Sequence, residues 1–291
     1  MVGGGREQGF LSLKNKLIKK FEETLAPEEI ELAKKDPHSR RRPRPCGFTL
    51  HVAKGCSGGC LYCYVKPPPV RNKLSPKALV YSLLLNPRFV PRKSFIAIGA
   101  VCEPLDFPDY TKELILELLQ LGNPIQLSTK EINYDLANLL RKIDTLISMC
   151  APDEEICKKF EPRRPSLSQR LEFCEAVKGG VFIRPILPMV PLEKYLKGIE
   201  KVVEYTDRII LGNLRLIGDV PKKLGIKNLS KKYYKRKRII EEYIRREFDV
   251  IVFRSACCSN AYKHKVICWN RCWEKGFCVR CPNRCWIRAS A

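Results

Sequence analysis

Three cysteines stand close together in the segment GCSGGCLYC, which covers residues 55–63. They are Cys56, Cys60 and Cys63. A closed tetrahedral metal site takes four protein ligands, so three thiols indicate either an open site or a distant fourth ligand such as Cys46. Three thiolates can hold three irons of a 4Fe-4S cube and leave the fourth iron open, and the glycines of the segment let the backbone approach a bulky inorganic group. The segment predicts a metal centre, either this open cube or a zinc knuckle.

A second group of cysteines lies near the C-terminal end. After Ser255 the sequence has 7 of the 15 cysteines and little periodicity, which indicates a metal-binding segment. Four thiolates close an iron–sulfur site or a zinc site equally well, and free or partly buried thiols are the third possibility. The expected ligands are four of Cys268, Cys272, Cys278, Cys281 and Cys285. Cys257 and Cys258 either join them or pack under the rim of the fold.

The elements that position the first cysteine group alternate between strand and helix. Strands are predicted within residues 47–53, 94–100, 123–128, 144–150, 180–187, 207–218 and 249–255, with helices between them such as 112–122 and 167–177. Repeated βα units imply an α/β fold with a mostly parallel sheet, open or barrel-like, whose active site lies at the carboxyl ends of the strands. The cysteine segment follows the first strand, so it lies at that edge.

Three regions are expected along the chain. Residues 1–45 comprise a charged amphipathic helix over 10–35 and an extended, proline-interrupted basic linker over 36–45. Residues 46–255 form the α/β unit, and residues 256–291 form the cysteine-rich tail.

The charge of the chain is strongly positive and unevenly distributed. The formal net charge is +23, and the segment 222–291 alone has 19 Lys or Arg against 5 Asp or Glu. Within it, Tyr233 and Tyr234 alternate with basic residues, and aromatic rings can stack on bases while Lys and Arg hold phosphates. This pattern favours a nucleic acid as partner. A solvated basic surface without a specific partner is the alternative.

Composition and length argue against several other classes. The hydrophobic fraction of 45% is normal for a globular protein. No segment approaches the roughly 20 apolar residues that cross a bilayer, and the first residues lack the pattern of a secretion signal, so we expect a cytoplasmic protein with no membrane partner. The 15 cysteines then favour metal or redox chemistry over a disulfide framework, since the cytosol keeps thiols reduced except in hyperthermophiles.

Taken with its position after the first strand, the spacing Cys-x3-Cys-x2-Cys resembles the radical SAM signature, including the aromatic Tyr62 before the last cysteine. The segments 125–131 and 148–191, with their "TK", "EPRRPS" and "RPILP" stretches, resemble the branch of the superfamily related to spore photoproduct lyase. The resemblance covers roughly residues 46–255. It implies a partial (β/α)6, TIM-like barrel.

The resemblance also implies roles for single residues. The thiolates of the loop would hold a 4Fe-4S cluster, and S-adenosylmethionine would bind beside it. The usual Gly-Gly-Glu of the family appears here as Ala100-Val101-Cys102-Glu103, so Glu103 is the candidate for the cofactor ammonium group. Further candidates for cofactor binding, at or near strand ends or in the loop, are Tyr62, Ser128, Lys130 and Arg184. For the last three, surface ion pairs are the alternative.

Several other residues have two interpretations. Cys102 is the candidate catalytic residue, because a thiol beside the cofactor can return a hydrogen atom to a product radical; a half-buried thiol without such a role is the alternative. Arg163 and Arg164 either belong to the site or solvate the start of a helix that Ser166 caps. Three more cysteines are expected to be buried as small hydrophobic side chains, namely Cys150, Cys157 and Cys174.

These residues together predict a radical SAM enzyme of lyase or transferase type. It would cleave S-adenosylmethionine reductively to a 5'-deoxyadenosyl radical and abstract a hydrogen from a nucleic acid, with an electron donor such as ferredoxin or flavodoxin as partner. The family context favours an auxiliary 4Fe-4S cluster over zinc in the tail. Modification of a protein or small molecule is the second possibility. A non-enzymatic, zinc-stabilised nucleic-acid-binding protein is the third.

Overall fold

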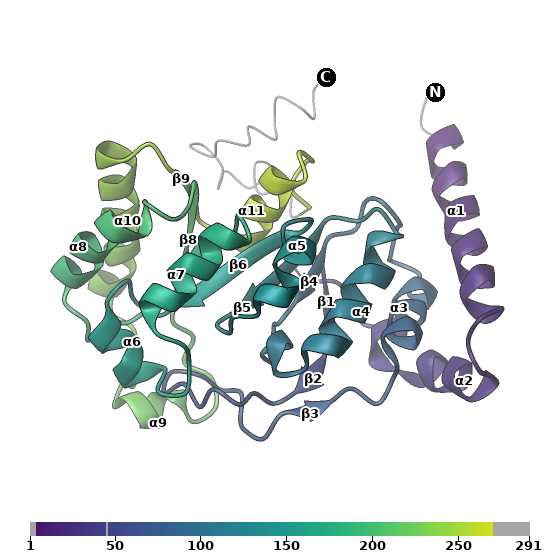
Figure 1. Cartoon of the computed structure of the whole chain (residues 1–291), viewed down its shortest axis with the longest axis horizontal. Coiled ribbons are helices and arrows are strands. Elements are labelled where there is room, and N and C mark those ends of the chain that lie inside the picture. Colours follow the sequence, from purple (N-terminus) through teal and green to yellow (C-terminus); the bar gives the residue numbers. More distant parts are fainter. Residues whose placement is uncertain (1–3, 45, 270–291) are drawn as a thin grey trace.

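The structure is a computed structural model that describes residues 4–44 and 46–269. At its centre is a seven-stranded sheet with the order β1-β4-β5-β6-β7-β8-β9, and every neighbouring pair is parallel (Figure 1). The strands are β1 Phe48–Leu50, β4 Ile96–Ile98, β5 Ile125–Thr129, β6 Asp144–Met149, β7 Gly180–Ile186, β8 Arg208–Asn213 and β9 Ile251–Phe253. Six of them lie within the segments in which the sequence predicts strands, and β5 extends one residue beyond its segment, to Thr129. The parallel α/β fold is confirmed and is that of a partial TIM-like barrel.

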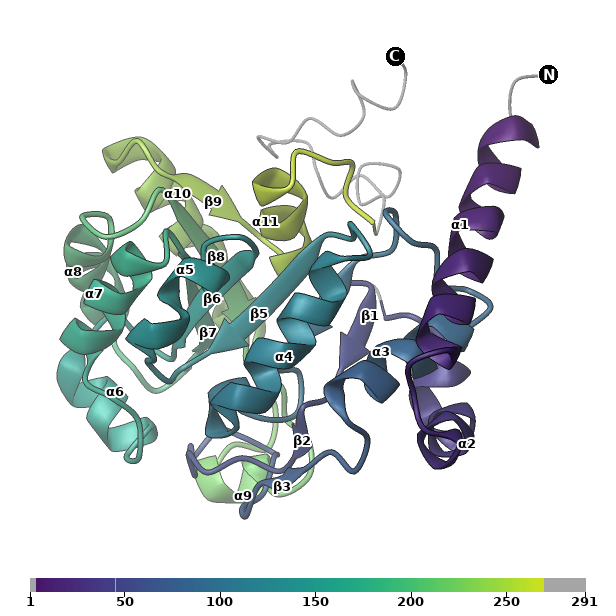
Figure 2. The ribbon, with the colours of Figure 1, turned by 45° about the vertical axis from the view of Figure 1, so that its right-hand side comes forward.

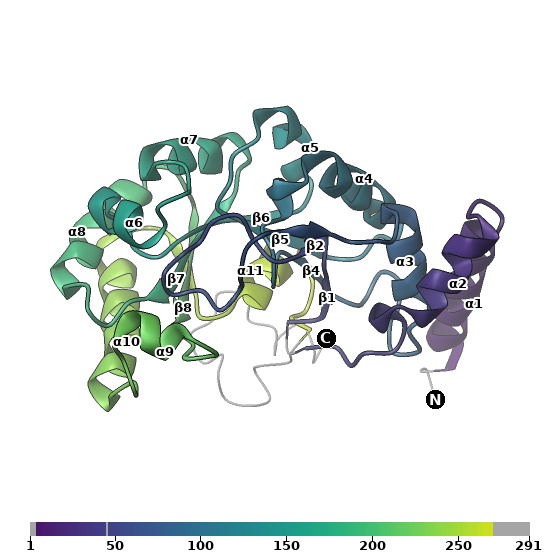
Figure 3. The same cartoon turned by 90° about the horizontal axis from the view of Figure 1, so that it is seen from below.

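The helices between the strands form an arc on the outer face of the sheet, as the view in Figure 3 shows. They are α3 Pro76–Leu85, α4 Pro108–Leu119, α5 Ala137–Leu140, α6 Glu154–Phe160, α7 Leu167–Ala176, α8 Leu192–Val202 and α10 Lys231–Glu247. Helix α7 begins with a capping box in which the Ser166 hydroxyl accepts from the backbone N–H of Gln169, which confirms Ser166 as its cap. Strand β6 is buried along its whole length although three of its six residues are polar, and its buried Asp144 carboxylate pairs with Arg208 over 3.1 Å.

The N-terminal region differs from the single helix predicted over residues 10–35. It contains two helices, α1 Gly4–Glu22 and α2 Pro27–Lys35, because Pro27 cannot continue a helix and instead begins a new one. Figures 1 and 2 place both helices on the α3 side of the molecule, away from α8 and α10. The predicted extended linker is also wrong in part, since residues 37–39 form a 3-10 turn with a buried His38.

Two short strands bracket the cysteine segment. They are β2 Ala53–Lys54 and β3 Val70–Arg71, which pair antiparallel just beyond β1. The intervening loop returns on itself at Gly55, whose φ of +95° is open to glycine and whose Cβ would lie 2.3 Å from the carbonyl oxygen of Pro68. The chain therefore holds the three cysteines in a closed loop at the carboxyl edge of the sheet.

The chain after β9 is more ordered than the irregular tail that the sequence predicts. Residues Ala256–Lys263 form helix α11, which contacts β6, β8 and β9 and lies inside the curve of the sheet (Figure 3). Ser259 of this helix donates to Asp144 at the start of β6 over 3.1 Å, so α11 closes the amino-terminal end of the sheet, opposite the cysteine loop. Within the described ranges, no helix is both long and apolar enough to cross a membrane.

Candidate active site

The cysteine loop places its three thiols at one edge with different exposures. Cys60 is buried, whereas Cys56 and Cys63 are half-buried. The backbone N–H of Cys63 donates to the carbonyl of Cys60 over 3.0 Å, which closes a tight turn. Burial raises the pKa of Cys60 to about 11, and the nearby Lys130 ammonium opposes this rise.

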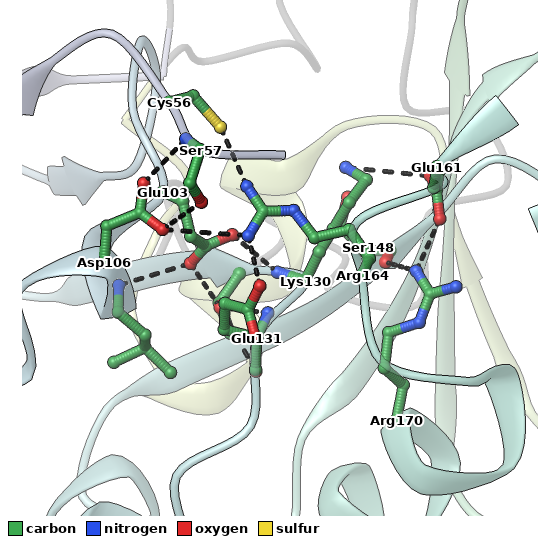
Figure 4. A network of polar contacts seen from close by, with 12 residues as sticks. Cys56, Ser57, Glu103, Asp106, Lys130, Glu131, Ser148, Glu161, Arg164 and Arg170 are labelled. Atoms are coloured by element: carbon green, nitrogen blue, oxygen red, sulfur yellow. Dashed lines mark hydrogen bonds and ion pairs between the residues drawn. The ribbon is translucent and has the colours of Figure 1, made fainter. Parts of the chain in front are cut away.

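Arg164 is the residue that joins the loop to the rest of the site (Figure 4). Its Nη2 donates to Sγ of Cys56 over 2.9 Å, and its Nη1 pairs with Glu131 and lies 3.7 Å from Asp106. The carboxylate of Asp106 in turn accepts from the backbone N–H of Ser57 over 3.0 Å. The Arg164 side chain is 1% exposed, so the alternative that it merely solvates a helix start is wrong.

A second buried ion pair lies behind the loop. Nη1 of Arg170 is 2.6 Å from Oε2 of Glu161, and the hydroxyl of Tyr62 donates to the other carboxylate oxygen, Oε1 (Figure 4 draws the ion pair). Nζ of Lys130 lies 4.0 Å from the same Oε1. Burial alone would raise the pKa of Glu161, but the two cations outweigh it and the pKa is lowered. The aromatic residue of the cysteine motif is therefore held by a carboxylate that the sequence analysis did not single out.

The residues following β4 bring Glu103 and Cys102 to the same edge. The Glu103 carboxylate is 4% exposed and accepts from the backbone N–H of Lys130 over 2.9 Å and from the hydroxyl of Thr129 over 2.5 Å. Burial raises the pKa of Glu103, although the charge of Arg164 lowers it. Burial also raises the pKa of the Cys102 thiol to about 12, so this thiol keeps its hydrogen at neutral pH.

The two remaining candidates lie on the strands. Ser128 is half-buried near the end of β5. Arg184 is near the end of β7 and stacks over Phe182 with its guanidinium carbon 5.5 Å from the ring centroid. Burial, followed by the charge of Arg215, lowers its pKa. In the described part of the chain Arg184 has no ion-pair partner, unlike Arg164 and Arg170.

A cavity of about 760 Å³ opens beside the loop. Its lining combines the residues flanking β2 and β3 with Val101, and it includes four basic side chains. These are Lys54, Lys66, Arg71 and Lys73. The volume falls in the range of pockets that enclose small ligands.

The basic segment that follows β8 also reaches the loop. Nζ of Lys223, on helix α9 Val220–Leu224, donates to the carbonyl oxygen of Cys63 over 3.5 Å. Tyr234 is 54% exposed, as a stacking residue requires. Tyr233 is only 4% exposed, and its hydroxyl accepts from the N–H of Leu214 and donates to the carbonyl of Ile186. The expectation that both tyrosines face a nucleic acid is therefore wrong for Tyr233.

The other cysteines separate into distinct places. Cys150, Cys157 and Cys174 are buried as expected, and the first two approach Glu161 closely enough that their ligand atoms lie within 4.8 Å of one another. Cys268 lies beside Cys257 and Cys258 of α11. The remaining ligands expected for the tail lie outside the described residues, namely Cys272, Cys278, Cys281 and Cys285.

The loop fits an iron–sulfur cube better than a single metal ion. In the described ranges, the sulfurs of Cys56, Cys60 and Cys63 do not form a group in which all ligand atoms lie within 4.8 Å of one another. A single ion requires such proximity, whereas each thiolate of a cube binds a different iron. A Cβ on Gly58 would lie 2.2 Å from Nε of Arg164. The absence of a side chain at Gly58 therefore leaves room for the Arg164 guanidinium beside the loop.

The similarities to known proteins agree with this geometry. Residues 50–182 match the sequence model of the Radical SAM superfamily. No curated protein sequence matches the chain. Among solved structures, the fold is similar to Streptococcus suis SuiB bound to S-adenosylmethionine, with 16% identity, a TM-score of 0.54, and coverage of 72% of this chain and 50% of that one.

Two further structures share the fold. A variant of spore photoproduct lyase with bound AdoMet and dinucleoside spore photoproduct has 15% identity, a TM-score of 0.57, and coverage of 72% of this chain and 77% of that one. A radical SAM methyltransferase from Sphaerobacter thermophilus has 14% identity, a TM-score of 0.51, and coverage of 73% and 68%. The chain thus spans about half of SuiB and 77% of the lyase. Residues 50–182 of this chain thus form a radical SAM domain.

Proposed function

We propose that this radical SAM enzyme holds its 4Fe-4S cluster on Cys56, Cys60 and Cys63 and abstracts a hydrogen from a nucleic acid. When bound, the cluster and S-adenosylmethionine supply a 5'-deoxyadenosyl radical, for which an external donor provides the electron. The observation that carries the cluster assignment is the glycine-rich three-thiol loop at the carboxyl edge of the parallel sheet, with Arg164 against Cys56. The radical SAM domain at residues 50–182 favours this enzyme over a non-enzymatic zinc protein.

Residues around the loop have separate proposed roles. Glu103, whose carboxylate is fixed by the Lys130 and Thr129 donors, accepts the ammonium group of the cofactor. Ser128 and Lys130 bind its carboxylate or ribose. Arg184 also binds the carboxylate or ribose, through the N–H donors of its planar guanidinium. In the described ranges no carboxylate forms an ion pair with this guanidinium.

Two side chains complete the proposal. Tyr62 packs behind the loop and stabilises its last turn through its hydrogen bond to Glu161. Cys102 gives the hydrogen atom of its S–H bond to the substrate radical and becomes a thiyl radical, which an electron from the external donor and a proton return to the thiol; the raised pKa keeps this thiol protonated beforehand.

A nucleic acid is the favoured substrate because positive charge borders the mouth of the site. Lys223 contacts the backbone of the cysteine loop, and the cavity beside the loop has four basic residues. The net charge of +23 supports attraction of a polyanion. A structurally similar spore photoproduct lyase holds a dinucleoside photoproduct, which is a precedent in this fold. A base within a duplex would have to leave the stack to reach the loop, so a single strand is the simpler ligand.

The cluster assignment can be tested by elemental analysis. Wild-type protein, the Cys56→Ala/Cys60→Ala/Cys63→Ala variant and a Cys174→Ala control would be purified without oxygen, and iron and sulfide would be quantified. The triple variant should lose about four irons per chain and all formation of 5'-deoxyadenosine with a strong reductant, whereas Cys174→Ala should lose neither. Full iron content in the triple variant would refute the assignment.

The substrate class can be tested separately by binding. We expect single-stranded DNA or RNA to bind with an affinity that falls steeply with salt. The reversal Lys222→Glu/Lys223→Glu on α9 should reduce the slope of log K against log salt by about 2, since each phosphate-contacting lysine contributes about 1. The matched reversal Lys34→Glu/Lys35→Glu on the remote α2 should leave it unchanged. Binding no tighter than to heparin, without a salt slope, would remove nucleic acid as the substrate.

A small molecule is the second candidate because of the cavity beside the loop. Its volume of about 760 Å³ suits a ligand of that size. If the nucleic-acid test fails while 5'-deoxyadenosine still forms, Val101→Trp should distinguish this candidate, because the added ring would fill the cavity and block turnover of a pocket-bound substrate.

A further inference from the structure

Three cysteines meet at helix α11, which lies inside the curve of the sheet (Figure 3). The sulfur atoms of Cys257, Cys258 and Cys268 all lie within 4.8 Å of one another. The sulfurs of Cys268 and Cys257 are 3.6 Å apart. All three side chains are buried, with exposures of 1%, 6% and 1%. The first two lie on α11, and the third lies on the chain that follows it.

A fourth cysteine approaches this group from the other end of the described chain. Sγ of Cys46, just before β1, lies 3.9 Å from the Ser255 hydroxyl, which is itself 3.1 Å from Sγ of Cys257. Cys46 does not itself lie within 4.8 Å of all three sulfurs, so its side chain must change rotamer to reach the same ion. Residues 46 and 255 are 209 positions apart in the sequence, and the fold alone brings them together.

The surroundings of these thiols are apolar. The cysteines of α11 and Cys268 belong to a buried cluster whose other members on the sheet are large hydrophobic residues, and Cys46 packs against it. These are Phe95, Leu146, Phe182, Ile210 and Phe253. A closed structural metal site takes four protein ligands and needs no path for a substrate. A buried, apolar environment is therefore compatible with a structural metal site.

We propose that Cys257, Cys258, Cys268 and Cys46 bind one tetrahedral metal ion of the zinc class. Tetrahedral zinc with sulfur at about 2.3 Å places its ligands about 3.8 Å apart. The 3.6 Å between Cys268 and Cys257 fits this spacing. A 4Fe-4S cube would bind each thiolate through a different iron and separate them further. The site thus differs from the auxiliary cluster expected in the tail, both in metal and in its use of Cys46.

The role of the ion is structural. It would link the segment before β1, the first strand of the sheet, to α11, which closes the amino-terminal end. Four thiolates leave no open position, so the ion does not take part in the radical chemistry. This inference does not rest on the proposed function, because it uses none of the residues of the cysteine loop.

The test is the metal content of full-length protein purified without oxygen. Wild type should contain about one zinc per chain in addition to the iron of the loop. Cys257→Ser/Cys258→Ser should lose the zinc and keep the iron, and the triple loop variant should show the reverse. Cys174→Ser, which removes a buried cysteine elsewhere, should keep both. Loss of iron rather than zinc from the double variant, or its retention of zinc, would overturn the proposal.

X-ray absorption at the zinc edge of the wild type provides a measurement that does not depend on a variant folding. Four sulfur neighbours at about 2.3 Å are expected, and fewer than three would contradict the site. Cys46→Ser should lower the sulfur number by one and speed the removal of zinc by a chelator. An unchanged sulfur number would refute Cys46 as the fourth ligand. If the iron of the loop were absent while these results held, the proposed function would fail and the zinc site would stand.

Discussion

The guanidinium of Arg164 and the thiol of Cys56 are 2.9 Å apart although 108 positions separate them in the sequence. Burial raises the pKa of Cys56, and the charge of Arg164 is among the influences that lower it. A cation beside a half-buried thiol favours the thiolate, which is the form that binds metal. Arg164 thereby links the loop to Glu131 and Asp106, and the loop is held from the side of α6 and α7.

A methyl group at residue 58 should disturb this arrangement. Gly58→Ala would place Cβ 2.2 Å from Nε of Arg164, and the buried guanidinium cannot move without losing its carboxylate partners. Since hydrogen bonds to charged groups contribute about 1.5–3 kcal/mol, we expect lower iron content and at least tenfold slower formation of 5'-deoxyadenosine. Gly59→Asn is the matched control, because φ there is +59°, which Asn tolerates, and no atom lies closer than 3.9 Å. Equal iron content in both variants would contradict the prediction.

Replacing the buried carboxylate after β4 should weaken cofactor binding. Glu103→Gln keeps the volume and removes the negative charge; since Thr129 and Lys130 donate to different carboxylate oxygens, the amide oxygen retains one of these two bonds. A lost charged hydrogen bond of about 1.5–3 kcal/mol corresponds to a roughly 10- to 150-fold higher Kd for S-adenosylmethionine, measured by calorimetry on the reconstituted protein. Glu113→Gln on α4 is the control. An unchanged Kd in Glu103→Gln would exclude this residue as the ammonium acceptor.

The two adjacent tyrosines of α10 should respond in opposite ways. Tyr233→Phe removes the acceptor of the Leu214 N–H and should lower the free energy of unfolding by about 1–3 kcal/mol, with little effect on nucleic-acid binding. Tyr234→Ala should change stability by less than about 1 kcal/mol and weaken single-strand binding by about 1–3 kcal/mol, the contribution of one stacked base. Denaturant unfolding and fluorescence anisotropy measure the two effects. Equal binding losses would show that neither ring stacks on the ligand.

Acid should destabilise the metal-free protein partly through His51. Burial lowers the pKa of His51 to about 3 from an ordinary value of 6.5, and nearby cationic side chains add to the effect. Between these values the unfolded chain binds a proton that the folded chain does not, so stability falls as pH falls through 6.5. From pH 7.5 to 5.0 the contribution is about 1–2 kcal/mol. His51→Phe should reduce the measured drop in unfolding free energy by that amount, and an identical drop would refute this origin.

Much of the fold could be predicted because its signals are local. Seven segments rich in apolar residues predict the seven strands in chain order, since buried parallel strands are mostly apolar, as β4 is. The cap Ser166 can likewise be predicted, because it stands three positions before Gln169, which is the spacing of a capping box. The break between α1 and α2 could also be predicted from Pro27, but the charged amphipathic pattern is the same on both sides of this residue and favours one helix.

The sequence by itself determined the three-thiol loop and its place after the first strand, because spacing and glycine content are properties of nine consecutive residues. Only the tertiary structure decided that Arg164 reaches Cys56, that Glu161 is held between Arg170 and Tyr62, and that Cys46 meets α11. Each of these contacts joins separate segments of the chain, and no sequence pattern indicates that they meet. The partner of a buried charge or thiol is whichever group the packed strands and helices bring within bonding distance. That partner is defined only in the folded sheet.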